Sequence, residues 1–226
     1  MIKLKSITML NTLFSNPISF IFYVISLLAA LTIHEASHAW VADRLGDPTA
    51  RLQGRISLNP LVHIDLYGAI FLLFFGFGWG KPVQFDPFNL KNPRKDGALI
   101  SLAGPASNLS LAIILSIVLR LFIFFNLPYF FIIGSILFVP LISMNVVLGL
   151  FNLIPVHPLD GFSIVAGLLP REKSQEWEGL QRYGMIFLLL LIIPLGSGSM
   201  LDTFLHPLVR LVTGLLIPVG RTAGIL

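Results

Sequence analysis

The sequence contains no cysteine and little charge, and each absence narrows what the protein can be. Without cysteine the chain has no disulfides, thiol nucleophiles or thiolate ligands, so a bound metal would be held by His, Asp or Glu. Only 12% of the 226 residues are charged, against about 25% in soluble domains. With 55% hydrophobic residues and a mean hydropathy of +0.87, a soluble or disordered chain is excluded. We expect an integral membrane protein.

The positions of the basic residues indicate how the chain is oriented in a membrane and do not indicate nucleic-acid binding. The net charge is +4 and the isoelectric point about 9.6, but the cations lie between apolar segments instead of forming one patch. If the polar gaps 43–66, 80–97 and 170–182 share one side, that side has ten Lys and Arg against two or three opposite. The positive-inside rule then places these gaps in the cytoplasm. Residues 1–10 resemble the basic start of a signal peptide, but no cleavage site follows, so we expect a retained first span.

The apolar segments predict an all-α polytopic membrane bundle. Five of them are expected to span the bilayer, at 17–40, 98–126, 129–154, 183–199 and 204–220. A sixth, 67–79, is too short for a comfortable span and is expected to be re-entrant or partial. The expected total is therefore about five to six transmembrane helices.

The polar gaps are too short for a soluble accessory domain. The stretch 51–58, RLQGRISL, alternates apolar and polar residues and predicts the edge of a small membrane-associated β-hairpin. We expect a single membrane-embedded domain over residues 1–226, with a core at about 17–170 and peripheral C-terminal helices at about 183–220.

One motif in the first apolar segment points to metal chemistry. His34-Glu35-Ala36-Ser37-His38 is an H-E-x-x-H sequence, and on a helix the i, i+4 spacing puts both imidazoles on one face. Glu35 can then act on a water at the metal. With five His and four Glu in the chain, roughly 0.002 chance matches are expected, and ionisable residues inside a span indicate function. The sequence predicts a zinc site at His34 and His38.

A third ligand is expected, because catalytic zinc usually has three protein ligands and one open position. Asp160 is the best candidate, since it follows a span that returns to the cytoplasmic side, near the end of the segment carrying the motif. Pro155 and Pro158 prevent a regular helix there, and Gly161 permits close approach of the backbone. Because His34 lies 17 residues after Pro17, the site would be about 25 Å along the helix, just inside the cytoplasmic boundary.

These motifs resemble the site-2 protease family of intramembrane zinc metalloproteases. The resemblance rests on His34-Glu35-x-x-His38 and on the Asn-x-x-Pro…Leu-Asp-Gly block at 152–161. Three further stretches resemble the compact prokaryotic branch: GRISLNPLVHID (54–65), GWGKPVQFDP (78–87) and ISLAGPASNL (100–109). The similarity spans roughly residues 20–170 in the expected order.

The resemblance implies a role for each matching residue. His34, His38 and Asp160 would be the ligands of one zinc ion, and Glu35 the general base and later proton donor. Asn152 would hold the substrate backbone. Asn108, which follows the Gly-Pro pair, would have a supporting role; for both asparagines an interhelical hydrogen bond is the alternative.

The other histidines are assigned less specific roles. His157 lies where relatives often carry an apolar residue or proline, and it is either a loop histidine, a partner of a ligand or a ligand itself. His63 belongs to the family pattern but is interpreted as structural. His206, near the last apolar segment, is expected to be too distant to bind the metal.

The expected function is hydrolysis of a peptide bond in or near the transmembrane segment of a membrane-anchored, single-pass substrate. The expected location is the cell membrane, with the site near the cytoplasmic face; a membrane regulator is left open, and no nucleic acid is expected. One alternative is an ion-handling membrane protein, but it would need repeated halves or a polar file through several spans, and neither is present. The other is a non-catalytic relative that binds membrane partners, which would not need Glu35.

Overall fold

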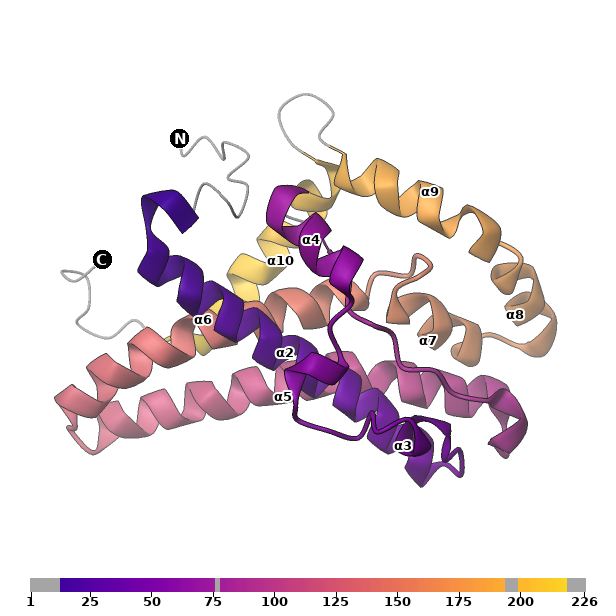
Figure 1. Ribbon diagram of the computed structural model, residues 1–226, viewed down its shortest axis with the longest axis horizontal. Helices are drawn as coiled ribbons and strands as arrows, with labels where there is room; N and C mark the ends of the chain where they lie inside the picture. The colour runs from indigo at the N-terminus through magenta and orange to yellow at the C-terminus, as the bar shows by residue number, and fades with distance from the viewer. Residues whose placement is uncertain (1–12, 76–77, 194–198, 219–226) are drawn as a thin grey trace.

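Three long helices form the centre of the protein in a computed structural model, which describes residues 13–75, 78–193 and 199–218. They are α2 (Pro17–Arg44), α5 (Pro93–Phe124) and α6 (Pro128–Asn152). Each begins with proline at its first position, where the missing N–H costs no hydrogen bond. The helices α5 and α6 run side by side as an antiparallel hairpin, and α2 packs across both (Figure 1).

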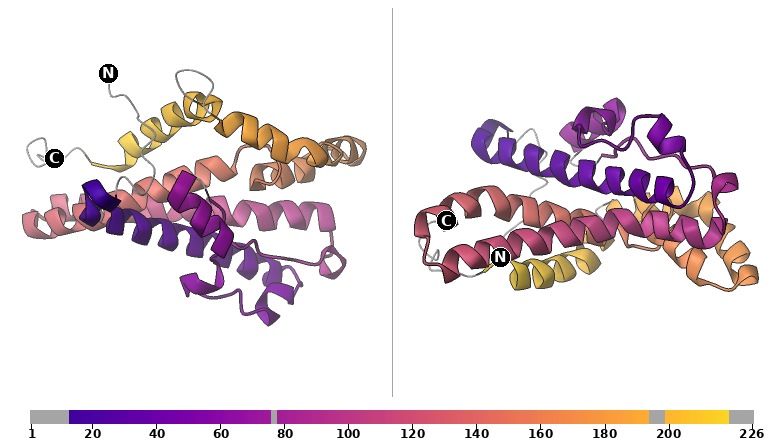
Figure 2. Two further views of the ribbon diagram at one scale, coloured as in Figure 1. Left: turned by 45° about the horizontal axis from the view of Figure 1, so that its top comes forward. Right: turned by 90° about the horizontal axis from the view of Figure 1, so that it is seen from below.

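The shorter helices surround this centre. After α2 come α3 (Thr49–Leu52) and α4 (Leu66–Phe75), with single 3₁₀ turns at Pro60–Val62 and Pro87–Asn89. After α6 come α7 (Asp160–Leu168), α8 (Arg171–Glu178), α9 (Gln181–Ile192) and α10 (Met200–Leu216). Figure 2 shows that α8 and α9 lead away from α7 and that α10 returns to lie alongside the α5–α6 hairpin. The α7 helix packs on α5, and α10 packs on α6.

The packed interior is small because much of the apolar surface faces outward. A core of Ala112, Leu119, Ile142 and Val146 lies between α5 and α6, and the apolar face of α10 covers it. Large side chains such as Ile113, Ile117, Ile133 and Ile136 are exposed, as expected of helices that face lipid. The three long helices are long and apolar enough to cross a membrane, so the expectation of a helical membrane protein is confirmed.

The expected count of five to six spans is not confirmed. Among the described residues only α2, α5 and α6 reach spanning length and apolarity. The segment expected at 183–199 forms a helix of 12 residues, α9, and the one expected at 204–220 forms a helix of 17 residues, α10, with Pro207 inside it. Residues 194–198 lie outside the described part of the chain.

The predicted β-hairpin edge at 51–58 is wrong. Residues 51 and 52 end α3, and the chain then turns at Gly54, whose φ is +69°. The Arg55 N–H bonds back to Ala50 O, and the buried Arg55 guanidinium donates to Val62 O and Lys81 O. This tertiary use of Arg55 produces a compact loop in place of a strand. In the described residues around it, the one antiparallel bridge joins Ile64 and Gly80.

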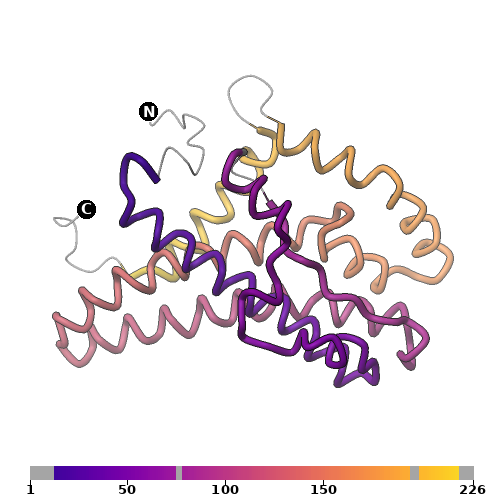
Figure 3. The backbone as a smooth tube through the Cα atoms, in the orientation of Figure 1, coloured from indigo at the N-terminus to yellow at the C-terminus, as the bar shows by residue number. Residues whose placement is uncertain are grey.

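The short apolar segment does form a partial element. The helix α4 has ten residues, about 15 Å of length, or half of the hydrocarbon thickness. Residues 78 and 79 return to its first turn, where a Cβ on Gly68 would lie 2.0 Å from Trp79 O. The chain path in Figure 3 shows this segment leaving the loops after α2 and coming back to them. The two ends of 67–79 therefore meet, as the re-entrant interpretation requires.

Candidate metal centre

The motif lies on one helix, as its spacing predicts. His34, Glu35 and His38 belong to the second half of α2 and are all buried. The imidazole rings of His34 and His38 meet edge to face, with centroids 4.6 Å apart. One turn of helix thus presents two ring nitrogens on the same side.

A second element brings the carboxylate to these rings. Asp160 is the first residue of α7, and its Oδ2 lies 3.1 Å from His34 Nε2 and 3.4 Å from His38 Nε2. The irregular residues 153–159 form the turn before it. A Cβ on Gly161 would lie 2.3 Å from Leu153 O, so only glycine permits this close turn.

Hydrogen bonds on the opposite ring nitrogens fix both imidazoles. His38 Nδ1 lies 2.7 Å from Ile100 O, and because a carbonyl only accepts, this nitrogen carries the proton. His34 Nδ1 lies 2.7 Å from Asn108 Oδ1, an acceptor, since Asn108 Nδ2 donates to Ala30 O. In both neutral rings the Nε2 lone pair therefore faces Asp160.

The donor set fits a divalent metal. Two lone pairs meet Asp160 Oδ2, a buried atom that has no hydrogen-bond partner. Ligand atoms of His34, His38 and Asp160 all lie within 4.8 Å of one another. Zinc bonds of about 2.0–2.1 Å in tetrahedral geometry separate two ligand atoms by about 3.3–3.4 Å, close to the distances found. With both imidazoles neutral, three electron-rich atoms meet here, and a divalent cation between them makes this arrangement favourable.

The surroundings support the same conclusion. On α5, a Cβ at Gly104 would lie 2.4 Å from His38 Nε2 and 2.6 Å from His34 Cε1. Glycine at this position leaves the space that the rings occupy.

Glu35 lies beside the group of His34, His38 and Asp160 and is not part of it. Its Oε2 accepts a hydrogen bond of 3.2 Å from the backbone N–H of Val83. The segment around Val83 therefore crosses α2 at the motif. Sequence reasoning assigned residues 78–87 to the family pattern but gave Val83 no role, because a backbone donor leaves no mark in the sequence.

The structure brings Asn108 to the site directly and leaves Asn152 at its edge. Asn108 contacts His34, as above. Asn152 is the last residue of α6, and its Nδ2 donates to Leu148 O one turn earlier. Among the described hydrogen bonds none engages Asn152 Oδ1, so this acceptor is available beside the turn that leads to Asp160.

The other histidines lie outside the ligand group. His157 Nε2 is 3.2 Å from Gln181 Nε2 on α9, and its ring packs on Phe162. His63 donates through Nε2 to Ser57 O and accepts the Lys81 N–H at its carbonyl, which is a structural role. His206 is on α10. Within the described residues, His34, His38 and Asp160 form the one group that could hold a metal ion.

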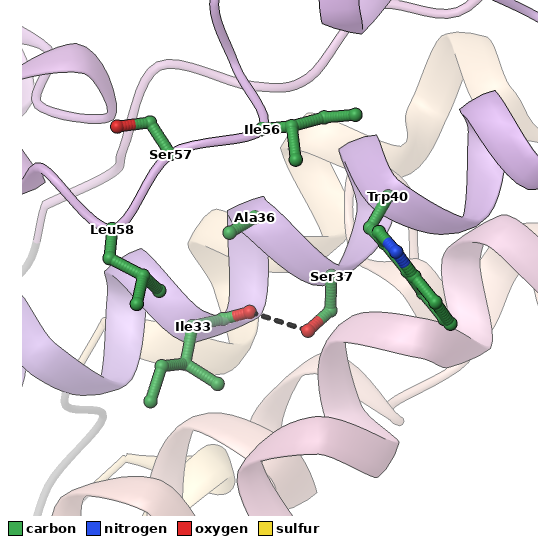
Figure 4. A pocket seen from close by; sticks show the side chains of 7 residues that line it. All are labelled: Ile33, Ala36, Ser37, Trp40, Ile56, Ser57 and Leu58. Atoms are coloured by element: carbon green, nitrogen blue, oxygen red, sulfur yellow. Dashed lines mark hydrogen bonds between the residues drawn. The ribbon is translucent and has the colours of Figure 1, made fainter.

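A cavity of about 280 Å³ lies against α2. Figure 4 shows Ile33, Ala36, Ser37 and Trp40 along the helix, facing the irregular segment 56–58. The Ser37 hydroxyl donates to Ile33 O, which leaves the cavity wall mainly apolar. These residues of α2 lie on a different face of the helix from His34 and His38, and none of His34, His38 and Asp160 is among the residues that line the cavity.

Comparison with known proteins identifies the family. Residues 22–131 and 130–192 match the family model described as Peptidase family M50. The chain is 42% identical over 186 residues to "Putative zinc metalloprotease YwhC" of Bacillus subtilis, which covers 80% of this chain and 85% of that protein. It is 27% identical over 180 residues to "Putative zinc metalloprotease Rip2" of Mycobacterium tuberculosis, covering 77% and 67%. No solved structure matches the chain significantly. The chain therefore belongs to peptidase family M50, the site-2 protease family, and is a zinc metalloprotease whose cofactor is Zn²⁺.

Proposed function

We propose that this protein is an intramembrane endopeptidase that cuts a membrane-anchored, single-pass protein in or near its transmembrane segment, as a step of regulated intramembrane proteolysis. The observation that carries the proposal is the position of three metal ligand atoms on and beside an apolar helix of spanning length. Such a centre serves a substrate that is itself in the bilayer. Its distance from Pro17, about 25 Å of helix, favours cleavage near one membrane face.

His34, His38 and Asp160 would hold the zinc, and Glu35 would move the protons. Zinc, when bound, lowers the pKa of a water and polarises the scissile carbonyl. Glu35 would take the proton of the attacking water and return it to the leaving amine. The Val83 N–H supports this role, because a donor at Oε2 orients the carboxylate without neutralising it.

The asparagines are proposed to have separate tasks. Asn152 would bind the substrate backbone, because its Oδ1 is an available acceptor for a peptide N–H next to the turn before Asp160. Asn108 would support the metal centre by holding His34, a contact of 2.7 Å. A hydrogen-bond partner on the ring nitrogen that does not bind the metal orients a metal-bound histidine.

The substrate would unwind and pair with the main chain of residues 56–58. A transmembrane helix hides its peptide bonds, so it must open before hydrolysis. Among the described hydrogen bonds none engages the main chain of Ile56 or Leu58, which leaves these groups available to pair with an extended peptide. Proline at Ile56 or Leu58 removes such a donor and should slow cleavage; unchanged cleavage would remove this part of the proposal.

We place the protein in the cell membrane as a multi-pass protein, with the site near the cytoplasmic face. The support is the excess of Lys and Arg in the gaps 43–66, 80–97 and 170–182. The described part of α9 and α10 is short for spanning, and these helices are proposed to complete the bundle around a core at about 17–170, all as one domain.

The decisive experiment reconstitutes the full chain in lipid with a single-pass substrate panel and compares wild type with Glu35→Gln. The wild type should cleave within or beside the transmembrane segment, and Glu35→Gln should retain zinc while losing cleavage. Substantial cleavage by Glu35→Gln would contradict the general-base role. A wild type that cuts only soluble peptides would contradict an intramembrane substrate.

A further inference from the structure

A second buried asparagine lies behind the first. Asn108 on α5 and Asn145 on α6 both have no exposed surface, and Asn108 Nδ2 donates to Asn145 Oδ1 at 2.8 Å. Neither the motif nor the family resemblance singles out Asn145. Together with His34 the two asparagines form a row that crosses from α2 to α5 to α6.

The direction of every hydrogen bond in this row is determined by backbone carbonyls. Asn145 approaches Leu141 O at 2.8 Å, and since a carbonyl only accepts, the Asn145 atom there is the nitrogen. Its oxygen consequently faces Asn108. Asn108 approaches Ala30 O at 2.9 Å, again with its nitrogen, so that both Nδ2 protons are used and Oδ1 is left for His34.

The alternative orientation of the Asn108 amide is strongly disfavoured. A flipped amide would put Oδ1 against Ala30 O and Asn145 Oδ1, both acceptors, and Nδ2 against the His34 Nδ1–H, a donor. Unmatched polar atoms in a buried, low-dielectric interior cost more than an exposed hydrogen bond gains. Asn145 supplies one of these contacts, and it is the one that comes from outside the α2–α5 pair.

We propose that Asn145 is a positioning residue for the metal centre, which acts through Asn108 to hold His34 with its Nε2 lone pair toward the metal. The inference rests on the proposed role of His34 as a ligand. It differs from the ordinary role of an interhelical asparagine, which joins α5 to α6 and has no effect on metal binding. The two roles predict different zinc affinities.

The test is a double-mutant cycle on zinc affinity, measured by competition with a chelator on the purified full chain. Asn108→Ala should weaken zinc binding by about 10–100-fold and Asn145→Ala by about tenfold, as partners of ligating histidines do. The double variant should bind no more weakly than Asn108→Ala alone, because Asn145 acts only through Asn108. Thermal unfolding checks that each variant is folded.

A matched control separates the effect of Asn145 on zinc affinity from the general effect of losing a buried hydrogen bond. Ser116, also buried on α5, donates through Oγ to Leu216 O, away from the metal centre. Ser116→Ala should leave zinc affinity unchanged. If Asn145→Ala does not fold, Asn145→Ser, which keeps an acceptor of shorter reach, replaces it in the cycle.

A conservative variant provides the rescue. A neutral aspartic acid at position 145 can donate its O–H to Leu141 O and accept from Asn108 Nδ2, as asparagine does. Asn145→Asp should therefore recover zinc affinity to within about threefold of wild type, together with the visible absorption of the Co²⁺-substituted site.

Two results would overturn the proposal. One is wild-type zinc affinity in Asn145→Ala, and the other is a double variant in which the effects of Asn108→Ala and Asn145→Ala multiply. Absence of zinc from the wild type would instead contradict the proposed function.

Discussion

Asp160 Oδ2 lies 3.1 Å from His34 Nε2, although α5 and α6 separate the two residues along the chain. Both histidines use their Nδ1 protons elsewhere, on Asn108 and on Ile100 O. With neutral rings, His34 Nε2 and Asp160 Oδ2 are both acceptors, and a metal ion between them makes their contact favourable.

Adding one methyl group at Gly104 should destroy the metal centre. The Cβ of Gly104→Ala would lie 2.4 Å from His38 Nε2, so the ring must move away from the metal. Zinc affinity and cleavage should both fall by at least about 10–100-fold. Gly97→Ala is the matched control on the same helix, because its Cβ would meet only Phe85, at 3.7 Å. Normal zinc content in Gly104→Ala would contradict the close packing described above.

Removing the N–H of Val83 should impair catalysis without removing the metal. In Val83→Pro the Glu35 carboxylate loses its 3.2 Å donor and becomes free to rotate. We expect kcat to fall by about tenfold or more with zinc content unchanged. Val83→Ala keeps the N–H and should cleave as the wild type does. Equal activity of both variants would exclude a positioning role for this hydrogen bond.

The stability of the loop that follows α2 should depend on the ionised Asp47 carboxylate and therefore on pH. Burial raises the pKa of the Asp47 carboxyl, but hydrogen bonds from Thr49, Asn89 and the Asp86 N–H lower it by more, so the net shift is downward. A lowered pKa in the folded state stabilises it above the unfolded value of 3.8, and this stability is lost as the pH falls through the folded pKa.

Thermal unfolding between neutral and acidic pH tests this role of Asp47. Asp47→Ala should destabilise the protein at neutral pH by about 2 kcal/mol, the size of hydrogen bonds to a charged group, and should flatten the acid part of the profile. Asp43→Asn is the control, since it breaks only a partly exposed ion pair with Arg51 and should cost less than about 1 kcal/mol. An Asp47→Ala variant with the wild-type profile would contradict the assignment.

The sequence predicted that His34, His38 and Asp160 lie together, because this prediction needs only helical spacing and the order of the spans. His34, Glu35 and His38 share a helical turn, and Asp160 follows from the need for a third ligand after a returning span. For Asn108 the resemblance implied only a supporting role, and its contact with His34 is found in the structure alone. These residues could be found because their type and spacing limit what they can do.

The parts that sequence reasoning missed depend on tertiary contacts. Asn145 is a single amide in an apolar helix, and its role follows from the register of α5 against α6. The alternation in RLQGRISL predicted a strand, but the Arg55 guanidinium donates hydrogen bonds to Val62 O and Lys81 O, which holds this segment as a loop. Apolar composition likewise gave no reliable length for α9, which ends at Ile192.

The most direct test of the central claim is the zinc content of the purified full chain in three forms: wild type, Asp160→Ala and His157→Ala. Asp160 faces both ring nitrogens, whereas His157 contacts Gln181 and Phe162. We expect one zinc ion per chain in wild type and in His157→Ala, and loss of zinc in Asp160→Ala. Zinc retained in Asp160→Ala and lost in His157→Ala would contradict the ligand group of His34, His38 and Asp160.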